Sequence, residues 1–330
     1  MSLLLVVACS DGVSSEGPDA DVLACYQEPT RCVDPDGAHV QFVVDSIVMP
    51  TSATHAQMLG VDVDGDPDGR PDNALGQILA ALARQGGVDL RASADEAVAA
   101  GTTITLIDLQ TADLSDAPNA GAWVLLGADP MPAPCADAGD SVCGRHLGGD
   151  ARFAVDPETP PASLLPGTLT DGRFRGGPGR IAVDLPVGDR VLRLHLIGAR
   201  VEAVVTGGGL VEGRLGGAIT QEQLQNDIIP TVWEVMFDAI GEDCPNTEPP
   251  CCIEGTTGET LIDLFDVDDD CMLELSELDC SGLGCYFLAP DLDLLDENGN
   301  FNPRHDLVKD SLSLGVGFTA VPAVFPEPAP

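Results

Sequence analysis

The clearest strand pattern in the sequence is VLRLHLIGARVEAVVTGGGLVEGRLGG, at residues 191–217. The leucines of this stretch alternate with polar Arg193 and His195, and a period of two is typical of a strand with one buried face. The glycines at 207–209 predict a hairpin turn, after which residues 210–217 supply another strand. The segment therefore predicts consecutive antiparallel strands, with His195 as an outward polar position.

Similar short strands recur along the chain between turns rich in Gly, Pro and Asp. They are expected at residues 40–49, 102–109, 122–126, 151–155, 180–185, 191–197 and 200–206. This spacing predicts a β-sandwich. Apolar periodicity and capping residues predict helices at 73–84, 92–100 and 220–240, and we expect a last strand, 311–325, to return to the sandwich.

The strongest local motif is the acidic run at residues 266–277, DVDDDCMLELSE. Alternating carboxylates followed by a glutamate at the twelfth position resemble the EF-hand calcium loop, because Ca²⁺ takes about six to eight oxygen ligands from one tight turn. Position 6 carries Cys271 instead of glycine, so a residue with a side chain must adopt a positive φ. The alternative is a solvated acidic junction between helices. The expected ligands are Asp266, Asp268, Asp270, the carbonyl of Met272, Glu274 and Glu277.

A second acidic loop occupies residues 62–73, DVDGDPDGRPDN. Its carboxylates would repel one another unless water or a cation neutralises them. The pattern resembles the Asp-x-Asp-x-Asp calcium loops of dockerin and thrombospondin-type repeats, although it has no glutamate at position 12; a solvated turn is the alternative. The expected ligands are Asp62, Asp64, Asp66, Asp68 and Asp72.

A third cluster, residues 296–306, has oxygen-bearing side chains at the same offsets as the second loop. Similar tails follow the two loops, DNALG at 72–76 and DSLSLG at 310–315. A duplicated calcium loop is one interpretation and an Asn/Gly turn is the other. The candidate ligands here are Asp296, Asn298, Asn300 and Asp306.

The composition is strongly acidic: 330 residues carry 54 acidic and 15 basic side chains, a formal net charge of −39 at pH 7. This excludes binding of nucleic acid or an anionic membrane through a basic surface. The single lysine, Lys309, follows no glycine-rich loop, which excludes a Walker-type nucleotide site. Three calcium ions would neutralise only a small part of the charge, and adaptation to a salty habitat is an alternative explanation of the rest.

The eleven cysteines favour disulfides and a location outside the cytoplasm. Cys25 and Cys32 flank one short loop and Cys135 and Cys143 another, so each pair predicts a bridge. The pairing of the other six, Cys244, Cys251, Cys252, Cys271, Cys280 and Cys285, stays open, and a bridge from Cys271 to Cys280 or Cys285 is one way to brace the acidic loop. The sequence VVAC at 6–9 resembles the lipobox of bacterial lipoproteins and predicts a lipid on Cys9, which leaves ten cysteines for bridges. The alternative is an ordinary apolar N-terminus with a free thiol.

These patterns predict an α+β fold class, mainly an antiparallel β-sandwich with a few helices and an EF-hand-like helix–loop insertion. The expected order is a truncated lipoprotein signal segment (1–9), a disordered tether (10–37), a β-rich body (38–245), an EF-hand-like calcium-binding segment (246–300) and a C-terminal strand that returns to the body (301–330).

Local motifs of catalysis are absent. The five histidines lie singly, which excludes a His-x-x-x-His zinc site, and neither Gly-x-Ser-x-Gly nor Gly-x-Gly-x-x-Gly occurs. An enzyme is therefore the less favoured interpretation. Its form would be a calcium-dependent secreted hydrolase with a pocket on the sandwich.

The lipobox-like start, the DxDGD loop with its DNALG tail, the EF-hand-like segment and the DSLSLG ending together resemble a group of uncharacterised, Asp-rich predicted lipoproteins of high-GC, myxobacteria-like bacteria. The resemblance implies a calcium-binding surface protein and carries no activity. We therefore expect a lipid-anchored protein of the outer membrane or extracellular space, with structural Ca²⁺ and a role in binding or adhesion to a surface ligand. Nucleic acid is not an expected partner, and the membrane is contacted only through Cys9.

Overall fold

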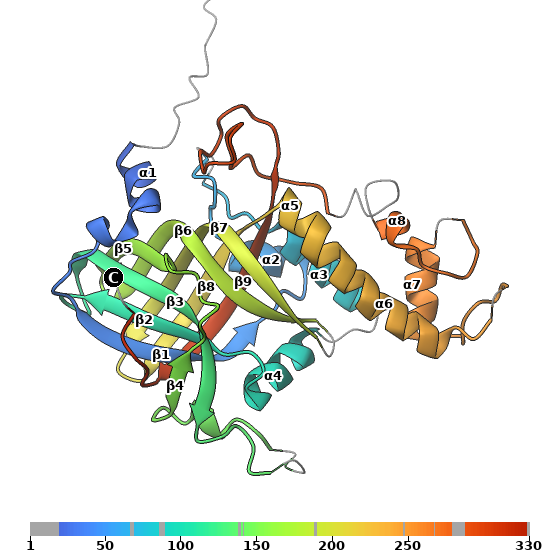
Figure 1. Ribbon diagram of the computed structural model, residues 1–330, viewed down its shortest axis with the longest axis horizontal. Helices are drawn as coiled ribbons and strands as arrows, with labels where there is room; N and C mark the ends of the chain where they lie inside the picture. Colours follow the sequence, from blue (N-terminus) through green and yellow to red (C-terminus); the bar gives the residue numbers. More distant parts are fainter. Residues whose placement is uncertain are drawn as a thin grey trace, which may run out of the picture.

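The computed structural model describes residues 20–66, 69–85, 90–137, 140, 142–187, 190–246, 248–266, 268–278 and 288–328 (Figure 1). Within these residues, nine strands form one antiparallel sheet in the order β2-β1-β9-β8-β7-β6-β5-β3-β4, and β2 also pairs with β3. That additional pairing closes eight strands into a barrel and leaves β4 outside β3. The strands are β1 (Ala38–Val48), β2 (Thr105–Thr111), β3 (Ala117–Met131), β4 (Arg152–Val155), β5 (Leu164–Thr170), β6 (Arg173–Val187), β7 (Arg190–Thr206), β8 (Gly209–Thr220) and β9 (Ser311–Pro322).

The prediction of a β-sandwich with an EF-hand-like helix–loop insertion is wrong, because the sheet closes on itself. The predicted short strands at 191–197 and 200–206 are one continuous strand, β7, which passes through Gly198 at a φ of 58°. The β7–β8 register shifts at this point, and the β6–β7 register shifts on both sides of Gly179. Such bulges bend a strand and increase its twist, so these long strands coil round into a barrel.

The barrel interior is a packed core. Leu194 and Leu196 are buried while His195 between them is exposed, so the predicted alternation and the outward position of His195 are confirmed. A cavity of only about 40 Å³ remains inside, room for a few water molecules at most. Its walls come from six strands and include Val44, Ile107, Leu185, Leu194, Leu215 and Phe318.

The predicted return of the last strand is confirmed, since β9 lies between β1 and β8. Beyond β9 the C-terminal tail, dark red in Figure 1, crosses the outside of the barrel. Gln41 fixes this tail, because its amide donates to the carbonyl of Phe325 and accepts from the Phe325 amide (2.9 and 3.0 Å). Phe325 and Trp123 are therefore buried in a second apolar layer outside the strands.

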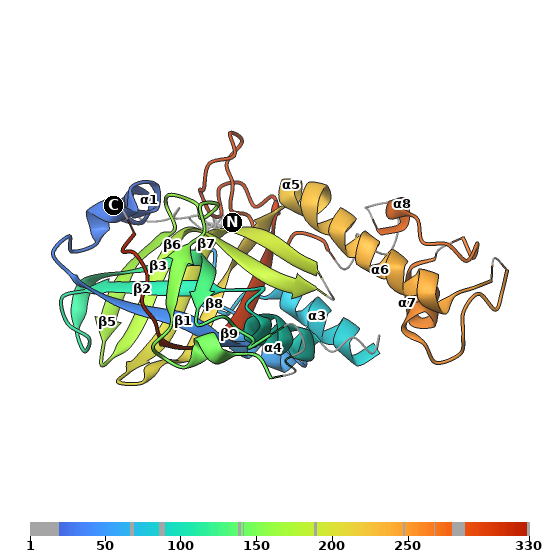
Figure 2. The same cartoon turned by 60° about the horizontal axis from the view of Figure 1, so that its bottom comes forward.

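The helices occupy two regions (Figures 1 and 2). Beside the barrel lie α2 (Ala53–Leu59), α3 (Ala74–Gln85) and α4 (Leu90–Ala100). Residues 221–278 form a helical lobe that extends away from it, with α5 (Gln221–Gln223), a π-helical turn (Leu224–Ile228), α6 (Ile229–Asp243), α7 (Thr257–Phe265) and the four-residue α8 (Leu275–Leu278). No helix of the described residues is long and apolar enough to cross a membrane.

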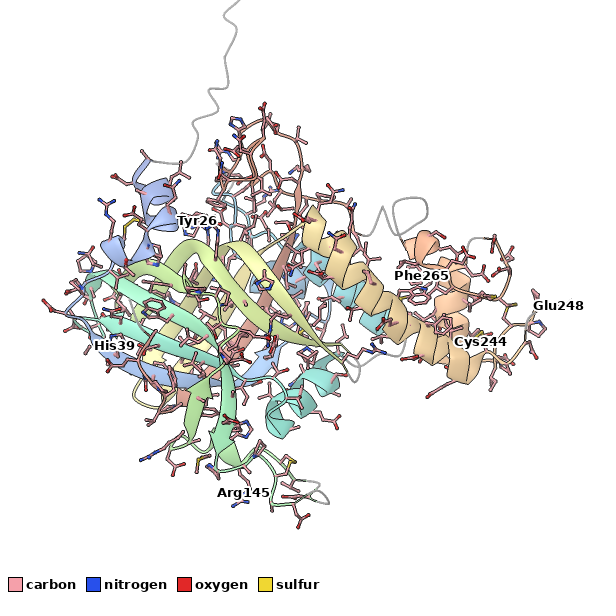
Figure 3. The ribbon with its side chains drawn as sticks, in the orientation of Figure 1. Tyr26, His39, Arg145, Cys244, Glu248 and Phe265 are labelled. Carbon is pink, nitrogen blue, oxygen red and sulfur yellow. A yellow bond between two sulfur atoms is a disulfide. The ribbon has the colours of Figure 1, made fainter. Side chains whose placement is uncertain are left out.

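Residues 20–37 correct the predicted tether. They form α1 (Ala20–Gln27) and a 3₁₀ turn (Pro29–Cys32), closed by the predicted Cys25–Cys32 disulfide. Tyr26, labelled in Figure 3, lies between α1 and the barrel. Its ring stacks on Phe301 with centroids 4.0 Å apart, and Arg180 lies over the same ring, 4.7 Å from its centroid. The composition of residues 10–37 predicts a tether because it is dominated by Asp, Ser, Gly and Pro, and it does not show that Tyr26 docks the segment on the barrel.

We expect Tyr26→Ala to release α1 from the barrel. Truncating a buried aromatic side chain costs about 3–5 kcal/mol, and the loss here is limited to the free energy that docking of α1 contributes. Limited proteolysis between α1 and β1 measures the release. Tyr26→Phe keeps the stacked ring and is the matched control, so equal cleavage of the two variants would contradict the docking role.

Candidate metal centres

Two groups of three carboxylates gather within the described residues, and each lies in a loop that the sequence singles out. In both groups the ligand oxygens lie within 4.8 Å of one another. The groups are Asp62, Asp64 and Asp66, and Asp266, Asp268 and Asp270. Three oxygens at this separation fit the first half of the coordination shell of a hard divalent cation.

The loop after α7 is shaped by its own carboxylates. Asp266 accepts hydrogen bonds from the amides of Asp270 (3.2 Å) and Cys271 (2.9 Å), and Asp270 accepts one from the amide of Met272 (2.9 Å). Cys271 has a φ of 66°, the positive value predicted for position 6. The turn is therefore formed without glycine.

Two contacts brace this loop, one to the connection between α6 and α7 and one to α6 itself. Cys271 forms a disulfide with Cys251, so the bridge considered from Cys271 to Cys280 or Cys285, which lie outside the described residues, is wrong. The indole nitrogen of Trp233 donates to the carbonyl of Leu273 (2.8 Å), whose side chain is only 2% exposed. Cys244–Cys252 closes the far end of the lobe, where Figure 3 labels Cys244 and Glu248. The loop is thus held before any ion arrives.

Glu274 and Glu277, the other predicted carboxylate ligands of this segment, are not part of the group of three. Glu277 accepts from the amide of Glu274 (2.8 Å), and Glu274 accepts from the hydroxyl of Ser276 (3.1 Å). Partial desolvation raises the pKa of Asp268, and the charges of Asp270, Glu277 and Asp266 raise it further. No Lys, Arg or His occurs between residues 215 and 303, so the segment itself supplies no cation.

The loop at 62–72 is closed more tightly. Val61 and Asp72 form a β-bridge, and the carboxylate of Asp72 accepts from the amide of Val63 (2.8 Å). Burial raises the pKa of Asp72 to about 7, and the charges of Asp64, Asp291 and Asp62 act in the same direction. Asp72 is therefore close to the carboxylate group, whereas the predicted ligand Asp68 lies outside the described residues.

Basic residues face this loop, and sequence reasoning missed them. Arg304 donates to the carbonyl of Gly65 (3.0 Å). Burial lowers the pKa of Arg200, on β7, while the charges of Asp62 and Asp64 oppose that shift. Closure of the barrel brings Arg200 to the loop, and no local sequence pattern marks such a contact.

The third cluster repeats the second loop in a different register from the predicted one. The amide of Asp72 donates to Val61 (2.9 Å), and the amide of Asp310 donates to Leu292 (2.8 Å). The carboxylate of Asp310 accepts from the amide of Leu294, as that of Asp72 does from Val63. The structural counterpart of Asp62 is therefore Asp293, not Asp296.

The stretch from 293 to 310 is longer than its counterpart from 62 to 72, and the predicted ligands of the third cluster lie in the additional residues. Asp296 accepts from the amides of Asn298 and Asn300 (2.9 Å each), and Asp306 accepts from the amide of Val308 (2.9 Å). These carboxylates therefore accept hydrogen bonds from backbone amides two to four residues further along the chain. Among the described residues of this turn, no group of three carboxylates is brought together.

A histidine–carboxylate pair is the closest approach to catalytic geometry. The Nδ1 atom of His39 lies 2.7 Å from a carboxylate oxygen of Asp108, whose other oxygen accepts from Gln41 (3.1 Å). Gln41 in turn holds the C-terminal tail, so the pair belongs to a structural network. In the described part of the chain, no serine or cysteine side chain is hydrogen-bonded to His39.

Comparison of the chain with protein-family models, curated proteins and solved structures finds no match in any of the three. The two carboxylate groups and their surroundings are therefore the features of this chain that bear on its function.

Proposed function

We propose that this protein binds Ca²⁺ at two loops, residues 62–66 and 266–270, and that the ions hold these loops in shape. The observation that carries the proposal is the convergence of three carboxylates in each loop. Oxygen ligands alone, with no histidine or cysteine sulfur among them, favour a hard cation, and calcium tolerates the irregular geometry of such loops better than magnesium does.

The two sites differ in how much carboxylate repulsion is left for a bound ion to neutralise. Arg200 and Arg304 already offset part of the charge at 62–66, whereas the segment around 266–270 has no basic residue of its own. Binding at 266–270 therefore relieves more repulsion. Because this loop is braced by Cys251–Cys271, little ordering of the chain opposes binding there.

The wider proposal is a secreted protein of the cell envelope, related to the Asp-rich lipoproteins that the sequence resembles and anchored by a lipid on Cys9, which lies outside the described residues. The four disulfides among the described residues support an oxidising compartment. A binding or adhesion role fits a barrel whose interior is filled by its own side chains.

Thermal unfolding in millimolar calcium and in chelator tests the calcium proposal. An ion that binds only the folded chain adds about 2.7 kcal/mol of stability at a concentration 100 times its Kd. For a chain of this size each kcal/mol raises Tm by about 1–2 °C. We expect Tm to rise with calcium and not with an equal ionic strength of NaCl; an unchanged Tm would contradict structural calcium.

A further inference from the structure

The helical lobe carries negative charge almost without internal compensation. Its 58 positions, 221–278, contain no Lys, Arg or His. They contain sixteen acids: Glu222, Asp227, Glu234, Asp238, Glu242, Asp243, Glu248, Glu254, Glu259, Asp263, Asp266, Asp268, Asp269, Asp270, Glu274 and Glu277. Arg190 at the start of β7 pairs with Glu234 and Asp238. The one calcium ion proposed for this lobe, at 266–270, would leave most of this charge in place.

Large apolar side chains are exposed in the same lobe. Phe237 is 47% exposed, Met272 54% and Leu275 42%. The rings of Phe237 and Trp233 are 5.0 Å apart, and Trp233 donates its indole hydrogen bond to Leu273, next to Met272. Trp233 and Phe237 therefore lie on α6, Met272 lies on the loop that contacts α6 through Leu273, and Leu275 begins α8 two residues after Leu273. We name Trp233, Phe237, Met272 and Leu275 the aromatic edge.

An acidic surface that also exposes large apolar side chains differs from an acidic surface that is merely solvated. Water-exposed acids alone keep a lobe soluble, but they do not require Phe, Met and Leu at the surface beside them. Tryptophan, phenylalanine and methionine are the residues enriched at protein interfaces, and a rim of one charge selects a partner of the opposite charge. A second copy of this chain would bring like charges together and is disfavoured.

We propose that the aromatic edge docks a cationic, amphipathic segment of a partner protein, with apolar side chains against Phe237 and Lys or Arg against the surrounding carboxylates. Met272 and Leu275 follow the 266–270 loop directly, but the aromatic edge consists of apolar side chains and not of carboxylates. The inference itself uses no bound ion, and peptide binding is therefore measured both in calcium and in chelator.

Titration calorimetry with short synthetic peptides tests this assignment on the oxidised chain near physiological salt, in calcium and in chelator. One peptide has a leucine face and a lysine face, a second replaces leucine by serine, and a third replaces lysine by glutamate. We expect the Leu/Lys peptide to bind and the other two to bind at least tenfold more weakly. Equal affinity of the Ser/Lys peptide would reduce the surface to bulk charge and overturn the assignment.

Variants locate the contact. Phe237→Ser and Leu275→Ser, both at exposed positions, are each expected to weaken binding of the Leu/Lys peptide about tenfold, the range seen when an anchoring side chain is truncated. Leu114→Ser, at a similarly exposed position beside the barrel, is the matched control and should bind as the natural chain does. Undiminished binding by both lobe variants would overturn the assignment. So would self-association of the chain that Phe237→Ser abolishes, since it would put a second copy on this surface.

Discussion

Asn73→Ala is expected to lower the free energy of unfolding by about 4 kcal/mol, because several buried groups lose their partner and each costs about 1–3 kcal/mol. Asn73 is 2% exposed. Its amide nitrogen donates to the carbonyls of Ala56 and Gly315 (2.8 Å each), and its oxygen accepts from the amides of Gly76 (3.0 Å) and Gly315 (2.8 Å). One side chain thus caps α3, holds α2 and fixes β9.

Urea denaturation of the oxidised protein, followed by circular dichroism, measures this loss. Asn226→Ala changes an exposed asparagine in the π-helical turn and should shift the unfolding free energy by less than about 0.5 kcal/mol. Asn73→Asp keeps the shape but turns a negatively charged oxygen toward two carbonyls, so we expect it to be no more stable than Asn73→Ala. A loss at Asn73 as small as that at Asn226 would contradict the role of this network.

Asp268→Asn is expected to change stability in opposite directions with and without calcium. In chelator the substitution removes one of the like charges that act on Asp266, Asp270 and Glu277, so stability should stay the same or rise. In millimolar calcium it removes a charged ligand, and up to about 2.7 kcal/mol of linked stabilisation is lost at a concentration 100 times the natural Kd. Asparagine keeps the side-chain oxygen, so the turn itself is preserved.

Thermal unfolding of the variant in both buffers checks this reversal. Asp64→Asn should show the same reversal with a smaller gain in chelator, because Arg200 already offsets part of the charge around Asp64. Asp227→Asn, an exposed acid of the same lobe away from the loop, should change Tm equally in the two buffers. A shift of one sign in both buffers for Asp268→Asn would show that its charge has no part in calcium binding.

Strand positions follow from sequence, whereas barrel closure does not. The alternation at 191–197 places Leu194 and Leu196 inside the barrel because side-chain direction depends only on neighbours along the strand. Closure depends on the β2–β3 pairing and on bulges around Gly179 and Gly198, where a glycine bends a strand instead of ending it. In a sandwich, glycines at these positions would end strands. Because the sequence alone does not distinguish a bend from an end, it predicts a β-sandwich instead of a barrel.

The candidate sites show the same division between local and distant contacts. The alternating carboxylates at 62–66 and 266–270 converge because a tight turn sets their spacing, and Cys271 takes the predicted positive φ. Arg200 reaches the first loop only through the fold. The spacing of oxygen-bearing side chains aligns Asp296 with Asp62, whereas backbone hydrogen bonds make Asp293 the counterpart of Asp62.

Calcium stoichiometry distinguishes two specific calcium sites from general attraction of cations to an acidic surface. The oxidised chain, stripped with chelator, is dialysed to equilibrium against calcium at physiological ionic strength, where bulk attraction to the acidic surface is screened. We expect saturation at two ions per chain, one for each carboxylate group, with weaker binding after Asp64→Asn and Asp268→Asn. Binding that never saturates, or that these substitutions leave unchanged, would contradict two specific sites.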